Sequence, residues 1–129
     1  NTNGLKLYEF TNDTIQWISQ NNFKNGILNL SIQHTSASLI VQENADLDVQ
    51  KDLINYFDKL APMDNKLYKH TTEGRDDMPA HLKTAILGNS LSIPIKNGNL
   101  NLGIWQGIFL CEHRNKVDSR KITATINGE

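Results

Sequence analysis

The segment Leu-Asn-Leu-Ser-Ile-Gln at residues 28–33 decides the fold class, because its side chains alternate between apolar and polar. Strict alternation predicts a β-strand with one face against a core. One further residue places His34 on the apolar face, where it is either a hydrogen-bonded core residue or a ligand. Thr-Ser-Ala-Ser at 35–38 follows at once with three hydroxyl groups. The end of this strand is therefore the first candidate site.

The same alternation recurs on both sides of this segment and predicts a mostly antiparallel sheet. Asn97-Gly98 is a tight hairpin signal between two such strands, and Pro94 predicts an edge position or a bulge. The strand that ends near Glu112 carries apolar side chains on both faces, which predicts burial on both sides. The other predicted strands are residues 5–10, 39–41, 91–96, 100–104, 108–113 and 122–126.

Three helices are predicted between the strands. The first begins at Thr11 or Asn12 and ends near residues 25–26. The second is an amphipathic helix over residues 49–60, and Pro62 terminates it. The third has Asp77 as its N-cap and closes at Gly88. Residues 1–129 therefore form a single α+β domain, mostly an antiparallel β-sandwich with about three helices. Exposed sheet edges favour pairing with another subunit.

Composition excludes several classes of function. The 129 residues carry 13 basic and 14 acidic side chains, a net charge of −1, so no field for nucleic acid or a membrane surface is predicted. No apolar run approaches the roughly 20 residues of a membrane span. The single cysteine, Cys111, excludes an internal disulfide framework and predicts a reducing, cytoplasmic setting.

Residues 70–83, His-Thr-Thr-Glu-Gly-Arg-Asp-Asp-Met-Pro-Ala-His-Leu-Lys, hold the densest group of chemically active side chains. His70 lies in a predicted loop, and His81 lies in the first turn of the predicted third helix. Together with His34 they offer three imidazoles, which leave one open position on a tetrahedral zinc ion, as in catalytic sites. Glu73, Asp76 and Asp77 orient the imidazoles, or bind the ion themselves if it is magnesium.

Two alternatives to this divalent metal site, in which zinc is preferred to magnesium, stay open. In the first alternative the histidines form a hydrogen-bonded polar cluster without metal, and in the second residues 70–83 are a solvated loop that caps a helix. Density of charge alone does not separate these alternatives, because charged runs are common on protein surfaces.

A second set of residues predicts recognition of a phosphate or pyrophosphate group. Arg75, Arg114 and Arg120 supply cations, and the 35–38 segment adds the hydroxyl groups of Thr35, Ser36 and Ser38. Lys83 is interpreted as an ordinary surface cation.

Three residues near the end of the chain have two possible roles each. Inward-facing Glu112 and Arg120 form either a structural ion pair or two walls of a catalytic site. Trp105 is either a core residue or a flat wall for an aromatic substrate.

Four motifs give the chain a resemblance to a known family. They are His-Thr-Ser-Ala-Ser-Leu at 34–39, Asp-Asp-Met-Pro-Ala-His at 76–81, Leu-Gly-Ile-Trp-Gln-Gly-Ile at 102–108 and Glu-His-Arg at 112–114. In order and over nearly the whole chain they resemble the YjbQ family, which is named for a secondary thiamine-phosphate synthase activity. Ile104 departs from the threonine usual at that position.

The resemblance implies a compact β-rich fold, a homotrimer with sites at subunit boundaries, and a metal near the histidines. It implies a reaction that joins an aminopyrimidine diphosphate to a thiazole phosphate and releases pyrophosphate. Two other classes remain open: a zinc-dependent hydrolase of a small phosphorylated substrate, and a trimeric small-molecule-binding protein without catalysis.

Overall fold

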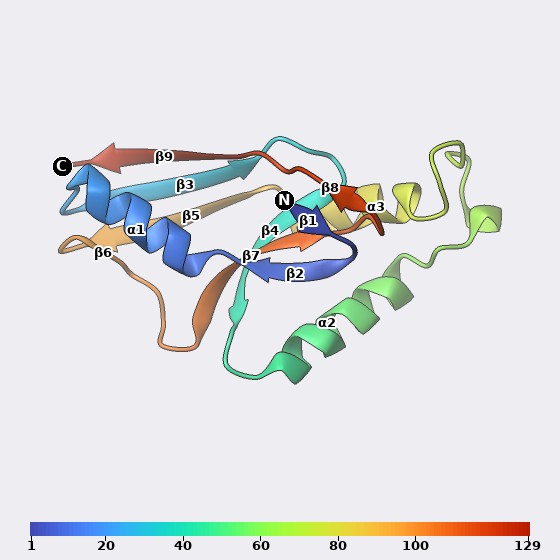
Figure 1. Cartoon of the computed structure of the whole chain (residues 1–129), viewed down its shortest axis with the longest axis horizontal. Coiled ribbons are helices and arrows are strands. Elements are labelled where there is room, and N and C mark those ends of the chain that lie inside the picture. The colour runs from blue at the N-terminus through green and yellow to red at the C-terminus, as the bar shows by residue number, and fades with distance from the viewer.

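The structure is a computed structural model that describes all residues, 1–129, and it has an α+β architecture of antiparallel sheets and three α-helices (Figure 1). The strands are β1 (Thr2–Asn3), β2 (Lys6–Glu9), β3 (Gly26–Ile32), β4 (Ala37–Glu43), β5 (Ser90–Lys96), β6 (Asn99–Leu100), β7 (Gln106–Glu112), β8 (Val117–Asp118) and β9 (Ile122–Gly128). The helices are α1 (Thr11–Asn21), α2 (Leu47–Leu60), the short 3₁₀ helix η1 (Asn65–Leu67) and α3 (Asp77–Leu87).

The four-stranded sheet has the order β6-β5-β3-β9 and carries the main core. Leu28 of β3 lies opposite Ile93 of β5 and Ile126 of β9, so the apolar faces of three strands coincide. Leu28, Leu30 and Ile32 are buried, which confirms the alternation over residues 28–33. Pro94 lies in β5, next to the short outer strand β6. Because β6 pairs only with Ile95 and Lys96 of β5, Pro94 has no strand partner on that side, and its missing N–H breaks no hydrogen bond there.

The three-stranded sheet has the order β2-β7-β4, with β7 in the centre. Every β7 residue from Gly107 to Glu112 is buried, which confirms the predicted burial on both faces. Ile108 and Leu110 join the core of the other sheet, whereas Phe109 and Cys111 pack with Leu7 on the opposite side. The last strand pair, β1 with β8, is short.

The number of α-helices, three, agrees with the prediction, but the residues at which they begin and end differ from the predicted ones. α1 stops at Asn21 rather than near residue 25, because Asn22 takes a left-handed conformation with φ of 56°. α2 begins two residues before the predicted start; its N-cap, Asp46, accepts a hydrogen bond from the backbone N–H of Asp48. Asp77 is not the N-cap of α3 but its first residue, and its carboxylate is used elsewhere. Gly88 ends α3 as predicted.

Several large apolar side chains of α2 and of the loop before β7 are exposed to solvent. Figure 1 shows α2 and the loop with η1 extending away from the two main sheets. Only Phe57 of α2 is buried, while Leu47, Tyr56 and Leu60 are exposed, as are Ile104 and Trp105 in the loop before β7. None of the helices is long and apolar enough to span a lipid bilayer.

Candidate functional site

Four side chains from residues 70–81 converge at the start of α3. His70 and Glu73 come from the loop, and Asp77 and His81 come from the helix. Asp77 and His81 are four residues apart, so they lie on the same face of α3, one turn apart. One potential ligand atom from each of the four lies within 4.8 Å of all the others. The loop and the helix together therefore form one compact cluster of metal-binding groups.

Asp77 lies at the centre of this cluster. Its Oδ2 atom is 2.7 Å from Nε2 of His70 and 3.1 Å from Nε2 of His81. The Oε2 atom of Glu73 is 3.2 Å from the same nitrogen of His70. Asp77 is buried, with 3% of its side chain exposed, whereas His70 is 42% and His81 31% exposed. A buried carboxylate thus faces two imidazoles that remain open to solvent.

Neighbouring groups hold the cluster in position. The Nδ1 atom of His81 donates to the carbonyl oxygen of Thr35 at 2.8 Å, which directs Nε2 toward Asp77. Arg114 donates from Nη1 to Oδ1 of Asp77 at 2.5 Å and from Nε to Asp76 at 3.0 Å. Its Nη2 also donates to the Glu73 carbonyl at 2.8 Å.

Gly74 allows the loop to approach Arg114. Its φ is +110°, a conformation that favours glycine, and a Cβ there would lie 2.9 Å from Oδ1 of Asp76. Any larger residue would therefore push the loop away from the arginine that holds it.

The pKa values of the cluster follow from these contacts. The hydrogen bond that His70 donates to Asp77 is the largest influence on His70 and raises its pKa. Burial alone would raise the pKa of Asp77, but the His70 hydrogen bond and the charges of His81 and Arg114 outweigh it and lower that pKa. The carboxylate is therefore ionised at neutral pH and attracts a cation or a proton.

The donor set fits a divalent metal ion. Tetrahedral zinc binds imidazole nitrogen and carboxylate oxygen at about 2.0–2.1 Å, which places the ligand atoms about 3.3–3.5 Å from one another. The three contacts of 2.7–3.2 Å are slightly shorter than that spacing, and no two of the four ligand atoms are more than 4.8 Å apart. A metal-binding histidine commonly donates its other N–H to a backbone carbonyl, as His81 does to Thr35. His70, Glu73, Asp77 and His81 would hold the ion.

His34 does not join this cluster, although the sequence predicted that it would converge with His70 and His81. Its Nε2 atom accepts a hydrogen bond from the backbone N–H of Lys121 at 2.9 Å. The ring lies beyond the end of β3, half-buried, and shares with His81 the wall of a separate depression. Asp77 and Glu73 take the place that was assigned to the third imidazole.

Two of the three predicted phosphate-binding arginines already have carboxylate partners. Arg114 is paired with Asp76 and Asp77, and Arg120 is paired with Glu112. Arg75 is exposed and donates only to the carbonyl of Met63, at 2.7 Å. Arg75 is therefore the only one of the three whose charge no carboxylate within 4.0 Å balances.

The three hydroxyl side chains of residues 35–38 lie in different surroundings and do not form one binding site. Thr35 is exposed beside His81. Ser36 is buried, and its Oγ accepts from Arg120 at 2.9 Å. Ser38 is fully buried, with its Oγ 2.7 Å from Nε2 of His113. The segment therefore contributes Thr35 to the exposed site and uses the two serines inside the protein.

Glu112 and Arg120 form a structural ion pair, one of the two roles that the sequence left open. Both are buried, and Arg120 donates to the two carboxylate oxygens at 2.8 and 2.5 Å. Thr2 donates to the same carboxylate at 2.6 Å. Burial opposes ionisation of Glu112, but these hydrogen bonds lower its pKa. Neither charge is directed at the metal-binding cluster.

Two buried polar residues were not found by sequence reasoning. Lys83 was interpreted as a surface cation, but it is 1% exposed and donates to Asp58 of α2 at 2.9 Å. His113 is fully buried, and burial lowers its pKa to about 3, so the ring is neutral. The apolar residues Phe109 and Cys111 on the same face of β7 were a signal that could have placed His113 inward, whereas no local pattern marked Lys83.

Trp105 is not part of the core of this chain, since 61% of it is exposed. Its backbone carbonyl accepts from Asn44, which fixes the loop, but its ring is free to contact another molecule. The adjacent Ile104 is 86% exposed. The core role is therefore wrong for a single chain, and the role as a flat wall for an aromatic substrate stays a prediction.

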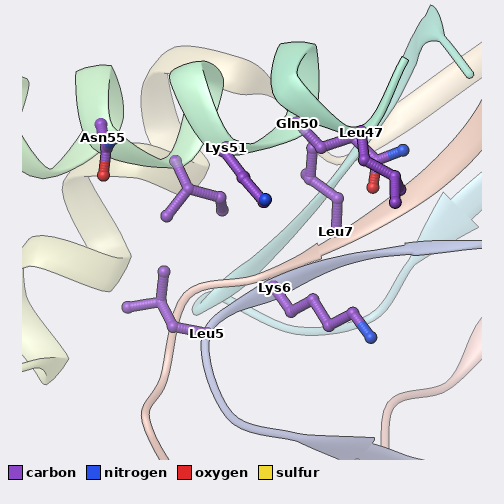
Figure 2. Close-up of a pocket in the computed structure, with 8 residues that line it drawn as sticks. Leu5, Lys6, Leu7, Leu47, Gln50, Lys51 and Asn55 are labelled. Carbon is purple, nitrogen blue, oxygen red and sulfur yellow. The ribbon is translucent and has the colours of Figure 1, made fainter.

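The largest hollow lies away from the metal-binding cluster, between β2 and α2 (Figure 2). Leu7 points from the strand toward the helix, where Leu47 and Gln50 lie, and Lys51 reaches into the gap. The hollow is about 580 Å³ and half of its lining residues are hydrophobic. Its only charged lining residues are Lys6 and Lys51, and it holds no carboxylate or imidazole that could bind a metal ion.

Comparisons with known proteins agree with the fold. A family model described as "UPF0047 protein YjbQ-like" matches residues 1–129. A UPF0047 protein of Synechocystis sp. is 45% identical over 99% of this chain and 87% of its own length. The UPF0047 protein YjbQ of Salmonella typhimurium is 51% identical over 81% of this chain and 75% of its own.

Solved structures give the same result. A YjbQ/UPF0047 family protein of Clostridium acetobutylicum superposes with a TM-score of 0.88 at 32% identity, covering 98% of this chain and 95% of that one. A YbjQ-like protein of unknown function from Sulfolobus solfataricus gives 0.91 at 26% identity, covering 100% and 91%. With the family model matched from end to end, the chain belongs to the YjbQ (UPF0047) family.

Proposed function

We propose that this protein is a divalent-metal-dependent enzyme that acts on small phosphorylated substrates and joins an aminopyrimidine diphosphate to a thiazole phosphate. The observation that carries the proposal is the cluster of His70, Glu73, Asp77 and His81, whose ligand atoms lie within 4.8 Å of one another. The identity of the two substrates rests on the family resemblance. The chemistry at the cluster rests on the geometry.

Mixed nitrogen and oxygen ligands favour zinc, because magnesium prefers an all-oxygen octahedral shell. When bound, a divalent ion would neutralise negative charge on a leaving pyrophosphate, and it would equally lower the pKa of a water molecule. The protein contributes the orientation of the ligands through Thr35 and Arg114.

The proposed transfer needs little acid–base chemistry. The C–O bond between the pyrimidine methylene and the pyrophosphate breaks, the electron pair leaves with the pyrophosphate oxygen, and the thiazole nitrogen forms a new bond to that carbon. The site must hold both substrates and stabilise the leaving group. Arg75, which has no carboxylate partner, is the cation left free to contact a phosphate. Trp105 lies at the opposite end of β7 from Arg114, so its exposed ring would offer a stacking surface to the site of a neighbouring subunit.

A metal-dependent hydrolase is the second candidate function. It is favoured by the fact that Arg114 and Arg120 are engaged with buried or half-buried carboxylates. Few cations then remain to bind two phosphorylated substrates at once, whereas hydrolysis needs one substrate and water. A binding protein without catalysis is the third possibility, and the experiment below separates all three.

We also propose that the chain assembles as a homotrimer in the cytoplasm, with its two main sheets packed as a β-sandwich. The sandwich is supported by Ile108 and Leu110 of β7, which share one buried cluster with Leu28 and Leu30 of β3. The trimer is supported by exposed Tyr56 and Leu60, which lie four residues apart on one face of α2, because exposed apolar surface of this kind marks an interface. The lone, buried thiol of Cys111 supports the reducing compartment.

Metal analysis and product analysis test the proposed function together. Protein purified without chelators or a metal-affinity tag is expected to carry one divalent ion per chain, and a His70→Ala, His81→Ala double variant is expected to carry none. The loaded protein should release pyrophosphate only when both substrates are present. Release of phosphate from one substrate alone would favour the hydrolase, and binding without turnover would favour the third possibility. Absence of stoichiometric metal would contradict the proposal.

A further inference from the structure

A shallow depression adjoins the metal-binding cluster through His81. It lies where the chain leaves β3 and where α3 ends, and its volume is about 370 Å³. That volume lies within the range of about 300–1,000 Å³ that is typical of small-molecule sites. The lining residues are His34, Thr35, His81, Thr84, Ala85, Gly88 and Asn89. None of them is a lysine, arginine, aspartate or glutamate.

His34 presents a hydrogen-bond donor at this depression. Its Nε2 atom accepts from the backbone N–H of Lys121, which is possible only when that nitrogen carries no proton. The neutral ring therefore holds its proton on Nδ1. No group within the chain accepts a hydrogen bond from this Nδ1–H, and the atom is not buried. The Lys121 contact thus fixes both the orientation and the tautomer of an unused donor.

The end of α3 supplies acceptors to the same depression. The last four carbonyls of a helix have no partner within the helix, and they carry the negative end of the helix dipole. The Thr84 carbonyl accepts from the backbone N–H of Gly88, which leaves the carbonyls of the next residues open. Ala85 is one of these and lines the depression.

This combination disfavours an anion. A phosphate placed here would meet the negative end of α3 and no cationic side chain, so its desolvation would not be compensated. A neutral group that accepts one hydrogen bond and donates another would satisfy both His34 and the carbonyls of the last turn.

We propose that this depression binds the aminopyrimidine ring of the substrate, with a ring nitrogen accepting from Nδ1–H of His34 and the amino group donating to the last-turn carbonyls of α3. The proposal rests on the proposed function. An aminopyrimidine has an acceptor next to a donor, whereas a thiazole has no donor to offer. The ring would sit beside His81, so that a phosphate attached to it extends toward the metal-binding cluster. His34 is then a specificity-determining residue and not a metal ligand.

Two variants of His34 separate its donor from its acceptor. In His34→Asn the side-chain amide nitrogen takes the place of Nδ1 and keeps a donor. In His34→Gln the amide reaches the place of Nε2, so the contact to Lys121 is kept and the donor at the depression is lost. The probes are 4-aminopyrimidine, 4-methylthiazole and inorganic phosphate, each titrated into metal-loaded protein by isothermal calorimetry, with metal content measured for every variant.

We expect 4-aminopyrimidine to bind the wild-type protein, and its Kd to rise about tenfold in His34→Gln, the effect of one lost hydrogen bond, but by less than threefold in His34→Asn. Metal content should stay unchanged in both. Equal affinity in His34→Gln and wild type, equal losses in both variants, or tighter binding of 4-methylthiazole would overturn the inference.

A measurement on the wild-type protein tests the same inference without depending on whether the variants fold. With nitrogen-15 labelling, 4-aminopyrimidine should shift the His34 Nδ1 resonance, and inorganic phosphate should not. A larger shift with phosphate would overturn the assignment of a neutral ligand. Protein that carries no stoichiometric metal as purified but binds 4-aminopyrimidine would contradict the proposed function and leave this inference standing, whereas metal-loaded protein that does not bind it would contradict this inference alone.

Discussion

Arg114 donates to Oδ1 of Asp77 at 2.5 Å and thereby turns Oδ2 of the same carboxylate toward His70 and His81. One arginine from the far end of the chain thus orients the central group of a cluster built by residues 70–81. The same side chain binds Asp76 and the Glu73 carbonyl, so it also holds the loop against α3.

Replacing this arginine should weaken metal binding without removing a ligand. We expect Arg114→Met to lower the zinc affinity about 10–100-fold, the usual effect of losing a group that orients a metal ligand. Competition with a chromophoric chelator measures the change. Arg75→Met is the matched control, since Arg75 contacts only the Met63 carbonyl and its loss should leave the affinity unchanged. Equal losses in both variants would show that net charge, and not orientation, is responsible.

His70 should titrate above an ordinary histidine in metal-free protein, because Asp77 stabilises its protonated form. Its pKa is raised, so its contribution to the free energy of unfolding is present in full below the unfolded value of about 6.5 and is lost as pH rises through the folded value. NMR titration of the ring measures it. In Asp77→Asn the pKa should fall back toward about 6.5, and a value unchanged by that substitution would contradict the assigned cause.

Arg120→Ala should unfold the protein more readily, and not merely slow a reaction as an active-site role would predict. It leaves the Glu112 carboxylate fully buried and without its cation, which costs about 3–5 kcal/mol. Urea denaturation gives the change in the free energy of unfolding. The exposed control, Arg75→Ala, should stay within about 0.5 kcal/mol of wild type. A loss below about 1 kcal/mol for Arg120→Ala would mean that water reaches Glu112.

Lys83 and Asp58 should respond unequally to substitution, because only the lysine is buried. Asp58→Ala leaves an unpaired ammonium group in the interior and should cost about 3 kcal/mol. Lys83→Met replaces the buried cation by an apolar chain of similar length and exposes only a surface carboxylate, so its effect should be small. Thermal denaturation of the two single variants and the double variant tests this order, and equal destabilisation by both single variants would contradict it.

The parts of the fold that sequence could predict are those with a local period. Alternation over residues 28–33 gave the correct buried face, and Asn97-Gly98 forms the predicted hairpin with both residues at positive φ. Helix ends were displaced where a single side chain had two possible partners: Asp77 could cap α3 or face Arg114, and it does the latter. That choice depends on a residue 37 positions away, which no local pattern records.

In the candidate site, too, residues close together in the sequence could be predicted, whereas contacts between distant segments could not. His70, Glu73, Asp77 and His81 lie within one short segment, and the sequence singled out that segment as the densest group of chemically active side chains. His34 comes from another strand, and its ring is directed by the backbone of Lys121, a contact between distant segments. Lys83 was misplaced because its burial depends on how α2 packs against α3, which propensity does not determine.

The last prediction concerns assembly. Light scattering is expected to return about three times the 14.6 kDa mass of one chain, since α2 exposes Leu47, Tyr56 and Leu60 and a lone chain rarely leaves such a surface in water. Leu60→Asp places a charge on that surface and should shift the mass toward one chain at micromolar concentration, because burying an unpaired charge opposes association. Lys24→Asp, an equally drastic change at an exposed polar position, is the control and should leave the mass unchanged. A monomer mass for the wild-type protein would remove the support for a site at subunit boundaries, while the metal-binding cluster, built within one chain, would be unaffected.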